Sequence, residues 1–371
     1  MDPHTQFCHN PDCPARGQSG LDNIRVHSRK EQRYRCTTCG RTFAATRDTP
    51  LYRLKKPLDM VALVITLLCH GCPLQAIVAA FGLDERTVAA WRDRAGQHGQ
   101  QLHEQLVLQG RVELGHVQAD ELYAKVVGRR LWMAMAMAVP SRLWLGGMVG
   151  ASRDLNLITA VVRMVRRAAK HLAFLVCVDG LASYVTAFKR VFRNPVRTGR
   201  RGRPRLVAIP GLLSGQVIKH HAGRRLVSVT RRVVLGTTQA IAAVLAATGT
   251  GTGINTAYIE RLNATFRAVV CPLVRRGRAL VRSAGALTGW MYLVGCAYNF
   301  CWEHDSLRTL AAPGERWKWQ QRTPAMAAGL TDHRWAMREL LSYPIRLPPW
   351  VAPKRRGRPP KRFSAPKAVF A

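Results

Sequence analysis

Two short-spaced cysteine pairs near the N-terminus constrain this chain most, because they limit how the first 50 residues can fold. Four residues separate Cys8 from Cys13, two separate Cys36 from Cys39, and a 22-residue loop joins the pairs. Two tight turns of this kind direct four thiolates at one tetrahedral zinc ion, and Gly40 supplies the backbone freedom that such a turn favours. We therefore expect residues 1–50 to be a zinc ribbon that needs its structural Zn²⁺ to fold.

The charge of the chain is strongly unbalanced. Its 371 residues contain 57 Lys and Arg against 21 Asp and Glu, which leaves a formal charge of +36, while 47% hydrophobic residues can fill a large core. This balance is unusual for an enzyme of small metabolites and predicts a polyanionic partner. Charge alone leaves DNA, RNA and an acidic membrane surface as alternatives. The first residues have no signal-peptide pattern, and residues 60–83, although uncharged, favour two helices over a membrane span, so we expect a cytoplasmic protein.

Residues 55–100 have the pattern of three helices, the last two with the spacing of a helix-turn-helix. An apolar run at 60–69 precedes a helix at 74–81, which Gly82 closes, and a further helix that begins after Asp84. Two helices packed at a steep angle would leave several side chains free for a DNA groove and its phosphates. These are Arg86, Thr87, Arg92 and Arg94. A generic helical hairpin is the alternative.

From about residue 112 to 310 the pattern changes to that of an α/β domain. The runs predict, in order, three antiparallel strands, a helix and a buried strand, at 116–126, 131–139, 143–149, 155–171 and 172–178. The buried strand stops at Asp179, and a strand end of this kind is a frequent place for chemistry.

Acidic residues are scarce in this domain. From Asp120 to Trp302 the carboxylates are Asp120, Glu121, Asp154, Asp179 and Glu260. Phosphodiester chemistry without a covalent intermediate uses two Mg²⁺ ions held by oxygen ligands, and two strand aspartates with one helix acid would suit it. Adjacent strand residues point to opposite faces, so we do not expect Asp120 and Glu121 both to face the metals. Asp154 is expected to cap the helix that starts at Leu155.

Glu260 is the sole carboxylate between Gly180 and Trp302, and it lies in a segment with helical periodicity. Ile259, Leu262 and Phe266 form an apolar stripe, while Glu260 shares the adjacent face with other polar residues. That face can present the glutamate to a site. A solvated glutamate on an ordinary amphipathic helix is the alternative.

These features occur in a recognisable order. Zinc-binding cysteines, a helix-turn-helix, an Asp on a first strand and an Asp after an apolar strand precede Asn-Thr-x-x-Ile-Glu-Arg-Leu-Asn-x-Thr-Phe-Arg at 255–267. In this order they resemble a DDE-type transposase of a short bacterial insertion sequence. The later Tyr298-Asn299-Phe300 and His304-x-x-Leu307 also match, so the resemblance spans roughly residues 8–310.

The resemblance implies a ribonuclease H-like catalytic domain, a mixed sheet with flanking helices, at 112–310. Asp120, Asp179 and Glu260 would be its catalytic triad and would bind two Mg²⁺ (or Mn²⁺) ions. Asn263 and Arg267 would support the site or touch the DNA backbone.

The implied activity is metal-assisted hydrolysis at the ends of the element, followed by attack of the 3′-hydroxyls on target DNA. The partner would be double-stranded DNA, bound by a homodimer or larger assembly on the nucleoid. Two alternatives are a non-catalytic zinc and helix-turn-helix regulator, including a decayed transposase, and a structure-selective nuclease of the same fold.

Two basic segments lie outside the resemblance. Residues 193–232 look like a basic insertion on nucleic acid, with Arg201 and Arg203 as contacts. In the tail, 345–371, Arg356 and Arg358 belong to an Arg-Gly-Arg-Pro core that resembles an AT-hook, an arm for a narrow A/T-rich minor groove. A nonspecific basic tail is the alternative.

Overall fold

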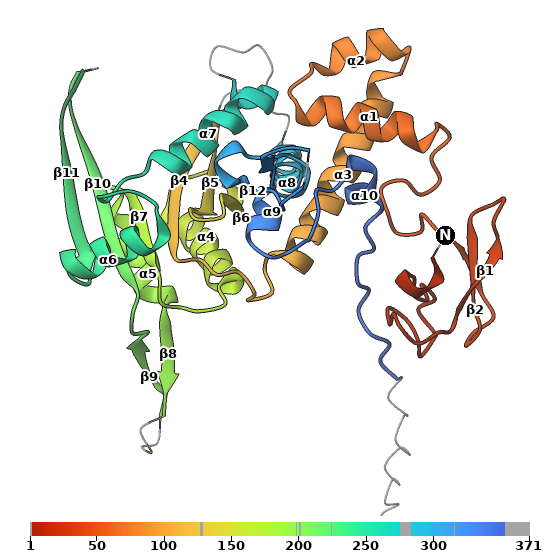
Figure 1. Cartoon of the computed structure of the whole chain (residues 1–371), viewed down its shortest axis with the longest axis horizontal. Helices are drawn as coiled ribbons and strands as arrows, with labels where there is room; N and C mark the ends of the chain where they lie inside the picture. Colours follow the sequence, from red (N-terminus) through yellow and green to blue (C-terminus); the bar gives the residue numbers. More distant parts are fainter. Residues whose placement is uncertain are drawn as a thin grey trace, which may run out of the picture. The chain divides into compact units, whose positions relative to one another are not determined.

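The computed structural model of the chain describes residues 2–126, 129–197, 199, 202–223, 225–274, 283–314 and 316–352 (Figure 1). The chain divides into two compact units, Met1–Arg47 with Arg346–Ala371, and Asp48–Ile345. Three predicted DNA contacts, Arg201, Arg356 and Arg358, lie outside the described residues, as does most of the AT-hook-like tail.

The first unit is built on a small antiparallel sheet. A 3₁₀ turn, η1 (Pro3–Thr5), precedes strands β1 (Ile24–Ser28), β2 (Arg33–Cys36) and β3 (Thr42–Ala44), which pair in chain order. Its buried apolar side chains are few, and they surround the cysteines: Ala15, Ile24, Tyr34 and Phe43. So small a core stabilises the fold weakly by itself, which agrees with the expected dependence on metal.

The second unit contains a six-stranded mixed sheet in the order β11-β10-β7-β4-β5-β6. The three predicted antiparallel strands are confirmed as β4 (His116–Val126), β5 (Arg129–Ala138) and β6 (Leu143–Gly150). The buried strand is confirmed as β7 (Leu175–Asp179), which ends at the expected aspartate and runs parallel to β4.

The region predicted as a basic insertion, 193–232, is corrected by the structure. β10 (Leu213–Ala222) pairs in parallel with β7, and β11 (Arg225–Leu235) continues the sheet, so both strands belong to it. Only the exposed hairpin of β8 (Arg193–Val196) and β9 (Arg205–Ala208) stands outside. β10 was not predicted from the sequence because only its first half is buried, so its pattern lacks a continuous apolar run.

Helices cover both faces of this sheet. Alternate residues of β7 point to opposite faces. Val176 and Val178 pack in the main core with α4 (Leu155–Ala168) and α5 (Ala182–Val191), whereas Leu175 and Cys177 pack in a second cluster with α6 (Thr238–Thr248). The sheet is therefore covered on both faces where β7 crosses it.

Three helices precede the sheet: α1 (Leu58–Cys69), α2 (Leu74–Phe81) and α3 (Glu85–Leu106). As expected, Gly82 closes α2 in a left-handed conformation, with φ 59°, and Asp84 caps α3 by accepting a hydrogen bond from the Thr87 amide. The uncharged window thus forms two short helices. Among the residues that the structure describes, no helix is long and apolar enough to cross a bilayer.

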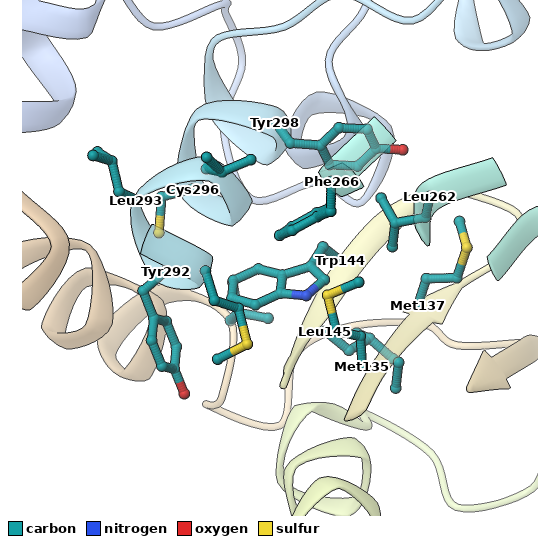
Figure 2. Packing of buried hydrophobic residues seen from close by; sticks show 14 of the residues in the cluster. Met135, Met137, Trp144, Leu145, Leu262, Phe266, Tyr292, Leu293, Cys296 and Tyr298 are labelled. Carbon is teal, nitrogen blue, oxygen red and sulfur yellow. The ribbon is translucent and has the colours of Figure 1, made fainter. Parts of the chain in front are cut away.

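The core fixes the helix that carries Glu260. Figure 2 shows Trp144 of β6 packed among side chains of α7 (Ala257–Val269) and α8 (Ala284–Phe300), including Phe266 and Tyr292. The backbone of Trp144 also exchanges two 2.9 Å hydrogen bonds with the side chain of Asn299. A Cβ on Gly295 would lie 2.3 Å from the indole, so only glycine lets α8 approach this closely.

The remaining elements are η2 (Cys271–Leu273), η3 (Asp305–Leu307), β12 (Thr309–Leu310), β13 (Trp319–Gln320), α9 (Pro324–Ala327) and α10 (Met337–Ser342).

Candidate metal sites and their surroundings

The four predicted zinc ligands lie together in the first unit. One sulfur atom each of Cys8, Cys13, Cys36 and Cys39 lies within 4.8 Å of the others. The Cys8 and Cys39 sulfurs are 3.7 Å apart, close to the edge of about 3.8 Å that a tetrahedron with Zn–S bonds of about 2.3 Å requires. The turn residue Gly40 has φ 73°, as the cysteine spacing predicted. Donor type and geometry therefore fit Zn²⁺.

Burial and hydrogen bonds change how readily thiols of this cluster lose their protons. Burial raises the pKa of Cys8. Burial acts in the same direction on Cys39, but hydrogen bonds from the Arg41 backbone and from Asn10 hold the pKa of Cys39 at about 7. Asn23 contacts the Cys36 sulfur through its amide nitrogen at 3.6 Å. Hydrogen bonds of this kind favour a thiolate and orient it toward the metal.

In the second unit, the pairing of β4 with β7 brings two aspartates together. The parallel register ends with Ala119 opposite Val178, so the next residues, Asp120 and Asp179, are neighbours at the end of β7. Residues at equivalent positions of adjacent strands point to the same face. That face is the one on which α7 lies against β4, as the bond from Asn263 of α7 to Asp120 demonstrates.

A residue that the sequence did not single out fixes the start of α7. Gln118 is fully buried on β4, and its side-chain oxygen accepts hydrogen bonds from the Tyr258 and Ile259 amides, each 3.0 Å long. Its amide nitrogen donates to the carbonyl of Asn255 at 2.8 Å. These amides are among those that a helix leaves without a partner in its first turn. A buried strand glutamine thus caps α7 from another element and sets the position of Glu260.

The three predicted catalytic acids line one open cavity of 690 Å³. Asp120 reaches it from β4, Asp179 from β7 and Glu260 from the first turn of α7. Asn263 and Arg267, also predicted, line the same cavity. The helical spacing placed Glu260, Asn263 and Arg267 on one face, and the structure presents that face to the two aspartates.

Glu121 requires a correction. The alternation of strand residues was expected to separate Glu121 from Asp120, yet carboxylate oxygens of Asp120, Glu121 and Asp179 all lie within 4.8 Å of one another. Alternation sets the direction of the Cα–Cβ bond only, and the longer glutamate side chain can return toward the end of β7. Asp154, the other rival, caps α4 as predicted, by accepting a 2.9 Å hydrogen bond from Leu157.

Two cations of the protein form ion pairs with Glu121, Asp179 and Glu260. The guanidinium of Arg153 lies 2.6 Å from Glu121 and 2.8 Å from Asp179, and it stacks over the ring of Trp132. Lys219 of β10 lies 2.6 Å from Glu260. Neither cation was found from the sequence, because both are ordinary basic residues in a chain that has many.

The acids differ in how easily they lose a proton. Burial raises the pKa of Asp120 to about 6, and the charges of Glu121, Asp179 and Glu260 add to this effect. Burial also acts to raise the pKa of Glu260, but the hydrogen bonds from Lys219 and Thr256 hold it below its ordinary value. Repulsion among crowded carboxylates is relieved when a cation binds between them, so this charge distribution suits a divalent metal.

Asn263 is buried against Asp120. It is 1% exposed, and its amide nitrogen donates a 2.8 Å hydrogen bond to Asp120. Its buried carbonyl oxygen accepts no hydrogen bond from the described residues. The sequence left two roles open for this asparagine, and burial favours the supporting one.

Oxygen ligands on three elements, with an unpaired amide oxygen beside them, fit hard cations such as Mg²⁺ or Mn²⁺. The carboxylate oxygens close enough together to share an ion are those of Asp120, Glu121 and Asp179, whereas Glu260 lines the same cavity outside this group. Glu121 is an additional candidate, although its side chain is fully covered and tied to Arg153.

The predicted DNA-reading side chains near Gly82 are only partly free. Arg86 is exposed, and Thr87 is half-buried at the start of α3. Arg92, expected to be free, pairs with Asp93 at 2.6 Å and lies over the ring of Trp290. Arg94 donates to the backbone carbonyl of Tyr52 at 2.7 Å. The helical pattern does not reveal Trp290 and Tyr52 as partners, because they lie outside α3. Arg203, on the β8–β9 connection, is exposed.

The chain matches no protein-family model, and a search of the curated proteins finds no similar sequence.

Proposed function

We propose that this chain is a DNA transposase that cuts and joins DNA ends at the cavity of Asp120, Asp179 and Glu260. The observation that carries the proposal is the convergence of these acids. They are separated by 59 and 81 residues along the chain, and they line a single open cavity together with Asn263 and Arg267. The resemblance to DDE-type transposases names the same five residues from the sequence pattern alone.

The surrounding architecture supports the same proposal. A mixed sheet with helices on both faces is the arrangement expected of a ribonuclease H-like catalytic domain. A four-cysteine cluster precedes it, and α2 and α3 have the turn and cap expected of a helix-turn-helix. We assign recognition of the element's ends to these two N-terminal modules. The charge of +36 suits a DNA partner.

In this mechanism the protein side chains position the metal ions and the DNA, and none of them reacts with the DNA. Asp120, Asp179 and Glu260 would hold two divalent ions, which would supply activation of the attacking oxygen and stabilisation of the leaving oxygen. Asn263 keeps Asp120 in place, and Gln118 holds the first turn of α7. Arg267 lines the cavity wall, and in this proposal it contacts a DNA phosphate. Water is the first nucleophile and the freed 3′-hydroxyl the second, so no protein atom forms a covalent bond to DNA.

A strand-transfer assay tests the proposal. Labelled DNA carrying the repeats that flank this gene is incubated with a plasmid target and Mg²⁺ or Mn²⁺. We expect Glu260→Gln to lower cleavage and joining by more than about a hundredfold, because a ligand of the reacting metals is lost. Binding to the labelled ends should persist, since Glu260 carries no DNA contact in the proposal.

The matched control is Glu113→Gln, which makes the same change at an exposed glutamate. It should cut and join like the wild type. Full activity of Glu260→Gln would contradict the assigned triad. End binding by the wild type without cutting or joining, under each divalent ion, would favour the alternative of a non-catalytic DNA-binding regulator. Cleavage of branched DNA without joining would favour a structure-selective nuclease.

A further inference from the structure

A second cavity, of 380 Å³, opens on another side of α7. Its polar lining comes from the β5–β6 turn, from α7 and from the segment around η3: Arg142, Tyr258, Arg261, Thr265, His304 and Ser306. Of these, Arg261 directly follows Glu260 in the sequence. One helix therefore forms a wall of both the carboxylate cavity and this basic cavity.

The basic cavity carries the positive charge of two arginines. Two arginines and a histidine line it, and none of its lining residues within the described part of the chain is acidic. The nearby carboxylate of Asp305 is exposed, and its charge acts to raise the pKa of His304. Burial lowers the pKa of His304, and the charges of Arg142 and Arg261 lower it further. A concave site with this sign of charge concentrates anions.

Arg142 is held in place by an unusual backbone. It has φ 57°, in the left-handed region, although it has a long side chain. Glycine adopts this conformation without strain, whereas other residues rarely do. The guanidinium lies 4.0 Å over the ring centre of Tyr258 and donates a 3.4 Å hydrogen bond to Ser306. Strained residues with a fixed side chain gather at functional sites.

The remaining polar groups suit a phosphate. Ser306 and His304 are 3.0 Å apart through the hydroxyl and the imidazole Nδ1, and Arg142 contacts the same hydroxyl. Guanidinium, imidazole and hydroxyl groups are the donors that proteins use for DNA phosphates. The volume lies within the range of about 300–1,000 Å³ that small-ligand sites occupy.

We propose that the basic cavity binds one backbone phosphate of the DNA strand, next to the phosphate that is cut, through Arg142, Arg261 and His304. This inference rests on the proposed function and adds a positioning contact to it. A helix with its side chains is about 10–12 Å wide, so a strand lying across α7 reaches both cavities within a few nucleotides. The contact would hold the strand in register with the carboxylates.

Binding of the full chain to end DNA in EDTA tests this contact. Each phosphate contact to a duplex contributes about 0.9 to the slope of log affinity against log salt. We expect Arg142→Gly and Arg261→Gln each to reduce this slope by about one unit. Arg142→Gly relieves the left-handed strain but also removes the guanidinium's contacts with Tyr258, Ser306 and the Val139 carbonyl, so its Tm is measured beside the slope to show that the variant is folded. Arg163→Gln, at an exposed arginine of α4, is the matched control and should change the slope less.

A scan with neutral phosphates locates the contact. Methylphosphonates replace the phosphates near the cleavage point one at a time. At one position the substitution should weaken binding by the wild type but leave Arg142→Gly unaffected. Equal slopes for Arg142→Gly and Arg163→Gln, or no such position in the scan, would overturn the inference. These binding data need no divalent metal, so they stand apart from the strand-transfer result, and either can fail alone.

Discussion

The four thiols of the first unit and the acids of the second unit both bring metal-ligand atoms together, but their surroundings differ. The thiols are buried or half-buried, and their neighbours include the amide of Asn23 rather than a cation. The acids line an open cavity, where Asp179 and Glu260 are each ion-paired with a cation of the protein, Arg153 or Lys219.

This difference indicates two kinds of metal binding. A closed thiolate site keeps its ion and contributes directly to folding. An open carboxylate site whose charges are partly offset by cations of the protein is expected to fold without the ion and to bind it reversibly. The second unit also has a large core of its own, whereas the first has a small one.

The largest expected effect is the loss of the first unit's fold on removal of zinc. Cys36→Ser takes away one of four ligands, and structural zinc contributes about 10–16 kcal/mol of apparent binding free energy in small zinc domains. We expect residues 1–47 to become sensitive to protease, while residues 48–345 keep their thermal transition. Limited proteolysis with metal analysis measures both.

Cys72→Ser, at a half-buried thiol outside the cluster, is the control for this change and should keep one zinc per chain. If the Cys36→Ser protein resisted protease as the wild type does, the small core would be sufficient and the contrast between the two units would disappear.

A second, smaller effect concerns acid. Burial lowers the pKa of His103 from 6.5 to about 3, with its ring packed against Trp144 and Tyr292. Because the pKa is lower in the folded state, the unfolded chain binds more protons below pH 6.5. The stabilisation is therefore complete above pH 6.5 and is lost as pH falls toward 3, by up to about 4 kcal/mol.

His103→Phe removes this titration and keeps an aromatic ring in the core. In thermal melts from pH 7 to pH 4, the Tm of the second unit should fall less in this variant than in the wild type. His221→Phe, at an exposed histidine, should follow the wild type. A parallel fall in all three proteins would assign the acid sensitivity to other groups.

The smallest expected effect is at the carboxylate cavity. Arg153→Gln removes the cation that pairs with Asp179 and Glu121. Mn²⁺ then no longer competes with it, so binding should tighten by about fivefold, the equivalent of about 1 kcal/mol. Calorimetric titration of the full chain with Mn²⁺ measures this change.

Arg163→Gln again serves as the matched control, because it removes the same charge at an exposed position of α4. Weaker Mn²⁺ binding by Arg153→Gln would mean that Arg153 supports Asp179 in its liganding position instead of competing with the metal.

Much of the second unit could be predicted from local patterns. The strands β4 to β7, the cap at Asp154 and the turn at Gly82 follow from periodicity and from residue types that act within a few positions of themselves. β10 could not be predicted in this way, because its place in the sheet depends on pairing with a distant strand. Its first residue, Leu213, pairs with Leu175 of β7, 38 residues earlier in the chain.

The two candidate sites also differ in whether local or long-range features of the sequence form them. The thiol cluster follows from spacing, since two short turns bring each pair together before any long-range contact forms. The carboxylate cavity was predicted through the order of motifs, but its partners were not. Gln118, Arg153 and Lys219 act across more than 25 residues of sequence, where a buried glutamine or one basic residue among many gives no local signal.

By itself, then, the sequence determined the four-thiol cluster, the strongly basic charge and the scarcity of acids that singled out Asp120, Asp179 and Glu260. Only the tertiary structure decided that Glu121 joins Asp120, that Asn263 is buried, and that Arg92 and Arg94 are engaged within the protein. The physical reason is range: turns, caps and periodicity act through neighbouring residues, whereas burial and ion pairing depend on which distant elements the core brings into contact.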